Sequence, residues 1–110
     1  MIAKKPGGTK SQRRSAGKYG RTSDWRGSLR RRLTKVREID GIFVVKEGAV
    51  VHVFTVMEDH QSDIYGTLMK QERLVEKDHP SLEFDFHTRL HQGRPPHRAV
   101  PYGAEKVFLK

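Results

Sequence analysis

The sequence has 110 residues and a mass of 12.7 kDa, which allows one small domain and leaves no room for two. Its 22 Lys and Arg residues outnumber its 13 Asp and Glu residues, giving a formal net charge of +9, and it contains no Cys. The lack of Cys excludes a disulfide-stapled secreted scaffold, a thiolate metal site, a Cys nucleophile and an iron–sulfur cluster. No stretch approaches the ~20 consecutive apolar residues of a membrane span. We therefore expect a cytoplasmic protein, with a transit peptide at the Arg- and Ser-containing start as the alternative.

Charge is divided sharply along the chain. Residues 1–37 contain thirteen Lys and Arg residues and a single acid, Asp24, for a net charge of +12. Residues 38–110 contain nine Lys and Arg residues against twelve acids, for a net charge of −3. The division predicts a basic segment joined to a mildly acidic folded unit.

Residues 1–22 consist mainly of Gly, Ser, Lys and Arg, with almost nothing apolar to bury. A segment of this composition cannot recover the conformational entropy that ordering costs. The sequence predicts a disordered basic N-terminal arm over residues 1–22 and a single α+β domain over residues 23–110.

An amphipathic helix is expected over residues 24–37. Ser23 is a suitable N-cap, and Asp24 would place a negative charge in the first turn. One helical stripe is apolar and consists of Trp25, Leu29, Leu33 and Val36. The remaining surface of this helix is almost entirely cationic.

A β-hairpin is expected next, with strands at Ile42–Val45 and Ala49–Met57 joined by a turn in which Gly48 has a positive φ. Both faces of the second strand are largely apolar. One face carries Val51, Val53, Thr55 and Met57, and the other carries Val50, His52, Phe54 and Val56. This pattern predicts a central strand that is covered on both sides, or on one side by its own chain and on the other by a second copy.

The last elements are a helix, a strand and a short final strand. Residues 63–78 carry helical periodicity and end at His79-Pro80, because a residue before Pro is pushed out of the α region. Residues 82–91 alternate strictly, with Phe84 and Phe86 on the apolar side and Asp85 and His87 on the polar side. Residues 107–109 form a candidate edge strand.

The resulting order is α–β–β–α–β, with a short final strand. A hairpin followed by a helical crossover predicts a small open sheet with helices on one face, related to a ferredoxin-like sandwich. No motif identifies a protein family.

Six histidines raise the question of a metal or catalytic site. His87 and His91 share a strand face, but at ~3.3 Å per residue their Cα atoms stand about 13 Å apart, too far to bind one ion. His52 could approach Asp85 or His87 across neighbouring strands. We expect these to be solvated surface side chains, with a small metal- or His/Asp-dependent hydrolase as the least favoured alternative, and so predict no catalytic residue, metal ligand or cofactor.

A second polar cluster, Glu58, Asp59, His60 and Asp63, lies at a strand-to-helix junction, where open α/β sheets tend to place sites. Carboxylates beside a His can bind Mg²⁺ or act as general acid and base. Asp59 and Ser62 are also good helix caps, and capping is the favoured interpretation. No phosphate-binding loop or nucleophile elbow accompanies this cluster.

The basic segment carries the strongest functional indication. Phosphate-binding segments need many cations on a backbone that can follow a groove, with planar side chains that stack on bases, and Tyr19 and Trp25 are interleaved here. Arg predominates, which favours bidentate phosphate contacts. The predicted nucleic-acid-binding residues are Lys4, Lys5, Lys10, Arg13, Arg14, Lys18, Arg21, Arg26, Arg30, Arg31, Arg32, Lys35 and Arg37.

The sequence thus favours a non-enzymatic nucleic-acid-binding accessory protein. RNA is favoured over DNA because Arg/Gly/Ser arms suit irregular RNA, and no helix-turn-helix, zinc finger or basic zipper is visible. The main alternative is a protein-interaction or dimerisation module that pairs through its sheet face and carries an incidental basic tail. A membrane partner is not expected, because the apolar stripe at residues 25–36 is needed by the fold.

Overall fold

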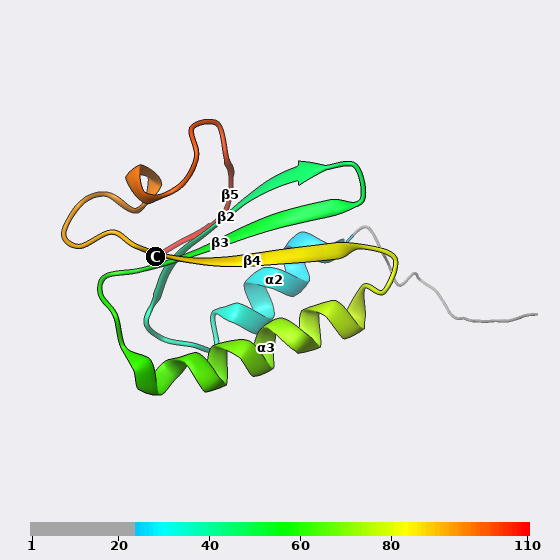
Figure 1. The fold of residues 1–110 in the computed structure, drawn as a ribbon, viewed down its shortest axis with the longest axis horizontal. Coiled ribbons are helices and arrows are strands. Elements are labelled where there is room, and N and C mark those ends of the chain that lie inside the picture. Colours follow the sequence, from blue (N-terminus) through cyan, green and yellow to red (C-terminus); the bar gives the residue numbers. More distant parts are fainter. Residues whose placement is uncertain (1–23) are drawn as a thin grey trace, which may run out of the picture.

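A four-stranded mixed sheet with two helices against one face makes up the computed structural model, which describes residues 24–110 (Figure 1). The strands are β2 (Ile39–Glu47), β3 (Val50–Met57), β4 (Glu83–Leu90) and β5 (Glu105–Leu109), and they lie in the order β4-β3-β2-β5. The predicted arm over residues 1–22 and the predicted N-cap Ser23 lie outside the described residues.

Helix α2 (Trp25–Leu33) is shorter than the helix predicted for residues 24–37. Its apolar stripe is confirmed, because Trp25, Leu29, Leu33 and Val36 are all buried. The chain leaves the helix after Leu33 through tight turns, in which the Thr34 hydroxyl donates to the carbonyl of Arg30. Asp24 occupies the N-cap position without a side-chain capping bond, rather than lying in the first turn as expected.

The β2–β3 hairpin forms where the sequence predicts it, with β2 longer than expected. The strands are antiparallel, with Glu47 opposite Val50, and Gly48 in the turn has a φ of +61°. A positive φ is unstrained only without a Cβ, so the turn selects Gly at this position.

Helix α3 (Tyr65–Asp78), preceded by the 3₁₀ turn η3 (Ser62–Ile64), crosses from β3 to the parallel strand β4. A parallel pair requires a crossover of this length. The predicted capping by Asp59 and Ser62 is wrong, because neither η3 nor α3 receives a side-chain cap. Gln61 and Ile64 occupy the two N-cap positions instead, so the chain enters α3 through the 3₁₀ turn.

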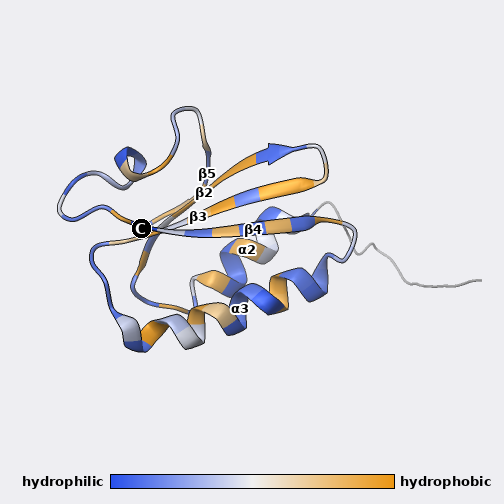
Figure 2. Cartoon of the chain, in the orientation of Figure 1, coloured by the Kyte–Doolittle hydropathy of each residue, from blue (hydrophilic) through white to orange (hydrophobic). Residues whose placement is uncertain are grey.

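The main core lies between the sheet and the two helices. From β3 it receives Val51, Val53 and Met57, and from β4 it receives Phe84, with Phe86 and Leu90 partly buried against it. The predicted facing of both strands is therefore confirmed. Figure 2 shows hydrophobic residues recurring among hydrophilic ones along both helices.

A second, smaller core covers the other face of the sheet. Phe43, Phe54 and Val56 are buried there beneath the β4–β5 connection, to which the 3₁₀ turn η4 (Pro96–Ala99) belongs. Ala99 and Val100 of that connection pack against them. Strand β3 is therefore central, and its two apolar faces are both covered by the chain itself over this part of its length.

Strand β5 forms the edge beside β2, as expected of a short final strand, and begins two residues earlier than predicted. The outcome is a small α+β fold with a mixed open sheet and both helices on one face. Among the helices of residues 24–110, none is long and apolar enough to span a bilayer.

Candidate functional site

Most of the Arg and Lys residues between positions 24 and 37 belong to helix α2. Its stripe from Trp25 to Val36 is buried, whereas Arg26, Arg30 and Arg31 are exposed and Arg32 is half-buried. The six cations that the sequence assigns to this region are Arg26, Arg30, Arg31, Arg32, Lys35 and Arg37.

Two of these cations are paired with acids. Arg26 forms a bidentate ion pair with Glu105 of β5, with Nη2 2.8 Å from Oε1, and its guanidinium lies 4.2 Å from the centroid of the Trp25 ring. Hydrogen bonding to Arg26 lowers the pKa of Glu105. Arg32 lies 3.0 Å from the carboxylate of Asp78 at the end of α3. These pairs connect α2 to β5 and to α3.

The other four cations have no ion-pair partner among residues 24–110. Arg30, Arg31, Lys35 and Arg37 are all exposed, on α2 or in the turns that follow it. We call these four residues the α2 cationic face. Cations that no acid of the described chain neutralises are available to an anionic partner.

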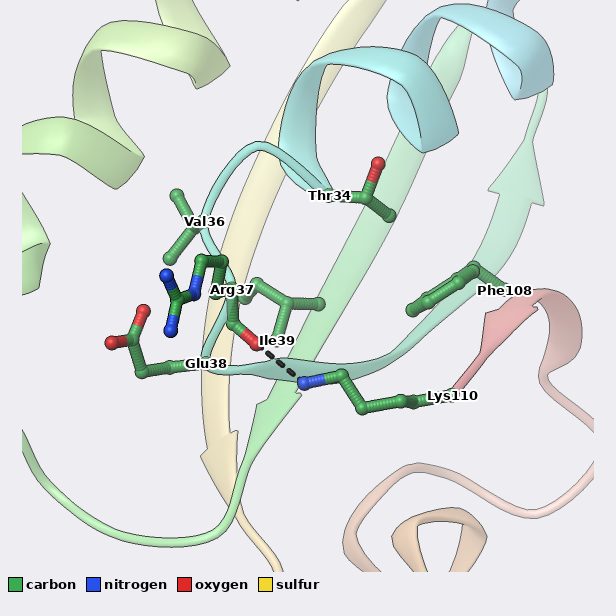
Figure 3. Close-up of a pocket in the computed structure, with 7 residues that line it drawn as sticks. All are labelled: Thr34, Val36, Arg37, Glu38, Ile39, Phe108 and Lys110. Atoms are coloured by element: carbon green, nitrogen blue, oxygen red, sulfur yellow. Dashed lines mark hydrogen bonds between the residues drawn. The ribbon is translucent and has the colours of Figure 1, made fainter.

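A hollow of about 500 Å³ opens at the end of this face, between the α2–β2 turns and β5 (Figure 3). Val36, Ile39 and Phe108 supply its apolar lining, and its polar side consists of Thr34, Arg37, Glu38 and Lys110. The Lys110 ammonium donates to the backbone carbonyl of Arg37, which connects the turn to the end of β5.

This lining mixes apolar groups with both signs of charge. The ring of Phe108 is only partly buried, Glu38 lines the hollow together with Arg37, and the Lys110 ammonium lies 3.5 Å from Asp40. A concave apolar surface with a few convergent polar groups is typical of binding sites for small planar groups.

The predicted cations of the arm cannot be placed relative to this surface. Lys4, Lys5, Lys10, Arg13, Arg14, Lys18 and Arg21 all lie outside the described residues. Their chain leads directly into Asp24 and Trp25 at the start of α2.

A first histidine cluster lies on the sheet face opposite the helices. His52 of β3 is in register with Asp85 of β4, and His87 follows two residues later on the same face. Asp85 Oδ2 lies 3.3 Å from His52 Nδ1 and 3.2 Å from His87 Nε2. The approach of His52 to Asp85 and His87 that the sequence suggested is therefore present.

A second cluster joins the ends of three strands. His91 Nε2 lies 2.7 Å from Asp40 Oδ2 and 3.5 Å from Glu58 Oε1, and His91 Nδ1 lies 2.7 Å from the carbonyl oxygen of Arg94. Both ring nitrogens face oxygen acceptors, an arrangement that favours the doubly protonated ring. Hydrogen bonding to Asp40 accordingly raises the pKa of His91. As expected from their spacing, His87 and His91 belong to different clusters.

The junction after β3 does not assemble into one site. Glu58 approaches His91, whereas the ring of His60 lies against the Tyr65 hydroxyl, 3.3 Å from Nδ1. The acids and the histidine that the sequence grouped here therefore diverge. No triad of nucleophile, base and orienting acid is formed by these residues.

Sequence reasoning missed Phe108 and Lys110 as neighbours of the cationic residues. The run from Val107 to Leu109 predicts a strand, but nothing local states that this strand pairs with β2 beside α2. Only the pairing of Ile42 with Phe108 places that ring at the hollow.

Comparison of the chain with protein-family models, with curated proteins and with solved structures gives no match in any of the three. Any function therefore has to be inferred from the residues and geometry described above.

Proposed function

We propose that the chain is a non-enzymatic nucleic-acid-binding accessory protein that acts in the cytoplasm and favours RNA over DNA. In this proposal the basic segment at residues 1–22 and the α2 cationic face contact phosphates, and the hollow beside them accepts one base. The folded body, for which a relation to ferredoxin-like sandwiches stays a prediction, holds these elements together.

The observation that carries the proposal is the concentration of uncompensated positive charge. Residues 1–37 have a net charge of +12, and the four cations of the α2 cationic face have no acidic partner among residues 24–110. Neutralising phosphates releases their condensed counterions, so such a surface gains free energy on any nucleic acid.

The hollow supports binding of a single strand rather than a duplex. Base stacking on an aromatic ring contributes ~1–3 kcal/mol per base, and it requires an unpaired base. Phe108 lies within reach of Arg37 and Lys110 along the same lining, so one nucleotide could use both stacking and charge.

The alternative of a dimerisation module has less support. This alternative was based on the apolar character of both faces of β3. Phe54 and Val56 on the second face are already buried under the β4–β5 connection, so they are not available to a second copy. The large hydrophobic side chains that remain exposed in the described chain, Met69, Tyr102 and Leu109, belong to separate elements.

Salt dependence of binding to a fluorescent single-stranded RNA tests the phosphate contacts. We expect a slope of log K against log salt near −3.5, from roughly five contacts at about −0.7 each. Replacing Arg30 and Arg31 with Gln should reduce that slope by about 1.4. Salt-insensitive binding, or no binding, would overturn the proposal.

The matched control is the pair Arg26→Gln and Arg32→Gln. It removes the same charge from the same helix, but from cations that are already paired with Glu105 and Asp78. We expect it to change the slope by less than half as much. Equal effects of the two pairs would show that net charge alone governs binding and that the α2 cationic face has no special role.

Replacing Phe108 with Leu tests the hollow. Loss of one stacked base should weaken RNA binding by about 5- to 100-fold at constant salt slope, since no charge is removed. Tyr102→Leu is the control, because Tyr102 is a fully exposed aromatic residue outside the hollow. Binding to duplex DNA should respond to neither substitution.

A further inference from the structure

We propose that His52, Asp85 and His87 form a binding site for a divalent transition-metal ion of the zinc class on the sheet face opposite the helices. Each of the three side chains offers a ligand atom within 4.8 Å of the others, and Asp85 Oδ2 faces His52 Nδ1 and His87 Nε2. The proposal is independent of nucleic-acid binding and departs from the sequence-based expectation that these side chains are merely solvated.

The backbone brings the three ligands together. Strands β3 and β4 are parallel and in register, with His52 opposite Asp85, so these two side chains leave the sheet side by side. His87 lies two residues after Asp85 and therefore on the same face. Ligands on paired strands are held more rigidly than ligands on loops.

The separations match those of a metal site. For ligands about 2.0–2.1 Å from a zinc ion, tetrahedral geometry places neighbouring ligand atoms about 3.3 Å apart. The observed separations from Asp85 Oδ2 are 3.3 Å to His52 Nδ1 and 3.2 Å to His87 Nε2.

Neighbouring groups fix the orientation of both rings. His52 Nε2 lies 2.9 Å from Glu47 Oε1, which holds the ring with Nδ1 directed at Asp85 Oδ2. A carboxylate on the far nitrogen is the arrangement typical of histidines that bind metals. The His87 ring is stacked on Phe54, with centroids 4.8 Å apart and planes inclined by 14°.

The electrostatics also favour a cation. Asp85 Oδ2 faces a ring nitrogen of each histidine, an arrangement that favours a positive charge between them, either a proton or a metal ion. Two carboxylates, Glu47 and Asp85, then compensate a dication. Arg89, on the same face, is directed over the Phe54 ring instead.

Two imidazoles and one carboxylate select zinc, cobalt or iron over magnesium or calcium, which prefer all-oxygen sites. The Asp85 side chain is 52% exposed, so a fourth position stays open to water or to a further ligand. The second cluster is not equivalent, because it offers a single histidine and the Lys110 ammonium already lies 3.5 Å from Asp40.

Titration of the purified full chain with Co²⁺, followed by competition with Zn²⁺, tests the site. We expect one equivalent of Co²⁺ to give the intense visible bands of a four-coordinate ion, and Zn²⁺ to displace it. Asp85→Asn and His87→Gln should each weaken binding by about 100-fold or more, and Glu47→Gln by about 10-fold. His97→Ala, which removes an exposed histidine outside the cluster, should change nothing, and circular dichroism of each variant checks that it is folded.

The proposal is overturned if the wild-type chain gives no four-coordinate spectrum or if Asp85→Asn and His87→Gln retain it. Loss of binding in Asp40→Asn alone would assign the metal to the His91 cluster and likewise overturn it. If the cluster instead holds a proton between His52 and Asp85, imidazole resonances will respond to pH and not to stoichiometric Zn²⁺, with the same consequence.

Discussion

His91 is the residue whose protonation the surrounding structure most clearly dictates. Its raised pKa means that the folded chain binds a proton more tightly than the unfolded chain. The resulting stabilisation is complete below the ordinary pKa of about 6.5 and is lost as the pH rises through the higher folded value. Buried His79, whose pKa is lowered mainly by desolvation, acts in the opposite sense, and its effect is confined to pH below its ordinary value.

We therefore expect the urea midpoint of the protein to fall as the pH is raised above about 6.5. His91→Gln should flatten that fall, because Gln has no proton to lose between Asp40 and the carbonyl of Arg94. Urea unfolding measured at several pH values from mildly acidic to alkaline, with His97→Gln as control, checks this. An unchanged pH profile in His91→Gln would show that the imidazolium contributes nothing to stability.

Two aromatic residues of β4 differ in burial and should differ in their contribution to stability. Phe84 is 7% exposed and Phe86 is only partly buried, although the rings are stacked with centroids 5.8 Å apart. Phe84→Ala should lower the free energy of unfolding by ~3–5 kcal/mol, whereas Phe86→Ala should lower it by about 2 kcal/mol. Equilibrium denaturation gives both values. Equal losses would show that the exposed flank of Phe86 is covered in solution.

At the scale of a single element, α3 contains an acid in an unfavourable place. Burial raises the pKa of Glu72 to about 7, and Glu76, one turn later, adds to the effect by like-charge repulsion. The folded chain thus keeps the proton that the unfolded chain has lost, so stability falls as the pH rises from about 4.5 to about 7.

Replacing Glu72 with Gln should remove this penalty. We expect the variant to be more stable than the wild type by about 1–3 kcal/mol at pH 8 and equal to it at pH 4, where both side chains are neutral. Glu76→Gln is the control and should give a smaller gain, since it relieves only the repulsion. Thermal melts at the two pH values check the difference, and a gain of equal size at pH 4 would contradict the electrostatic explanation.

Elements were predictable to the extent that periodicity alone defines them. The stripe from Trp25 to Val36 and the alternation through Phe84 identify which faces are buried, because burial of apolar surface dominates the energetics of a small domain. The helix ends were not predictable. Asp59 and Ser62 have good capping side chains, but the N-cap position of η3 is Gln61. Where the helix begins also depends on the path of the chain after β3, which local sequence does not specify.

For the whole molecule, the division between basic segment and folded body leads to a deletion experiment. Every residue of the described core lies between Trp25 and Phe108. Removing residues 1–22 should therefore leave cooperative unfolding intact and lower nucleic-acid affinity by at least about tenfold, because each lost phosphate contact removes counterion release. Thermal melting checks the cooperative unfolding, and fluorescence anisotropy on the same preparations checks the nucleic-acid affinity. Loss of a cooperative melt would show that the segment is structural, and unchanged affinity would confine binding to the folded body.

The candidate sites depend on pairings between distant parts of the chain, so only fragments of them are predictable from the sequence. Phe108 joins the hollow through the pairing of β5 with β2, and Asp85 meets His52 through the register of two parallel strands. A one-residue slip of β4 would place Asp85 on the other face. The sequence identified the residue types that matter but not the register that brings them together.

The β4–β5 connection has a further consequence for how the molecule is assembled. Strands β4 and β5 lie at opposite edges of the sheet, so the connection must cross the second face, and the same segment that delivers the final strand also covers Phe43 and Phe54. The hairpin and the crossover helix can form early from contacts close in sequence, whereas β5 must find a partner near the opposite end of the described chain.

We expect amides shared by β2 and β5 to exchange with deuterium before those shared by β3 and β4, and uniform protection would contradict this order. A single proteolytic cut in the β4–β5 connection would loosen one edge and one face of the sheet together.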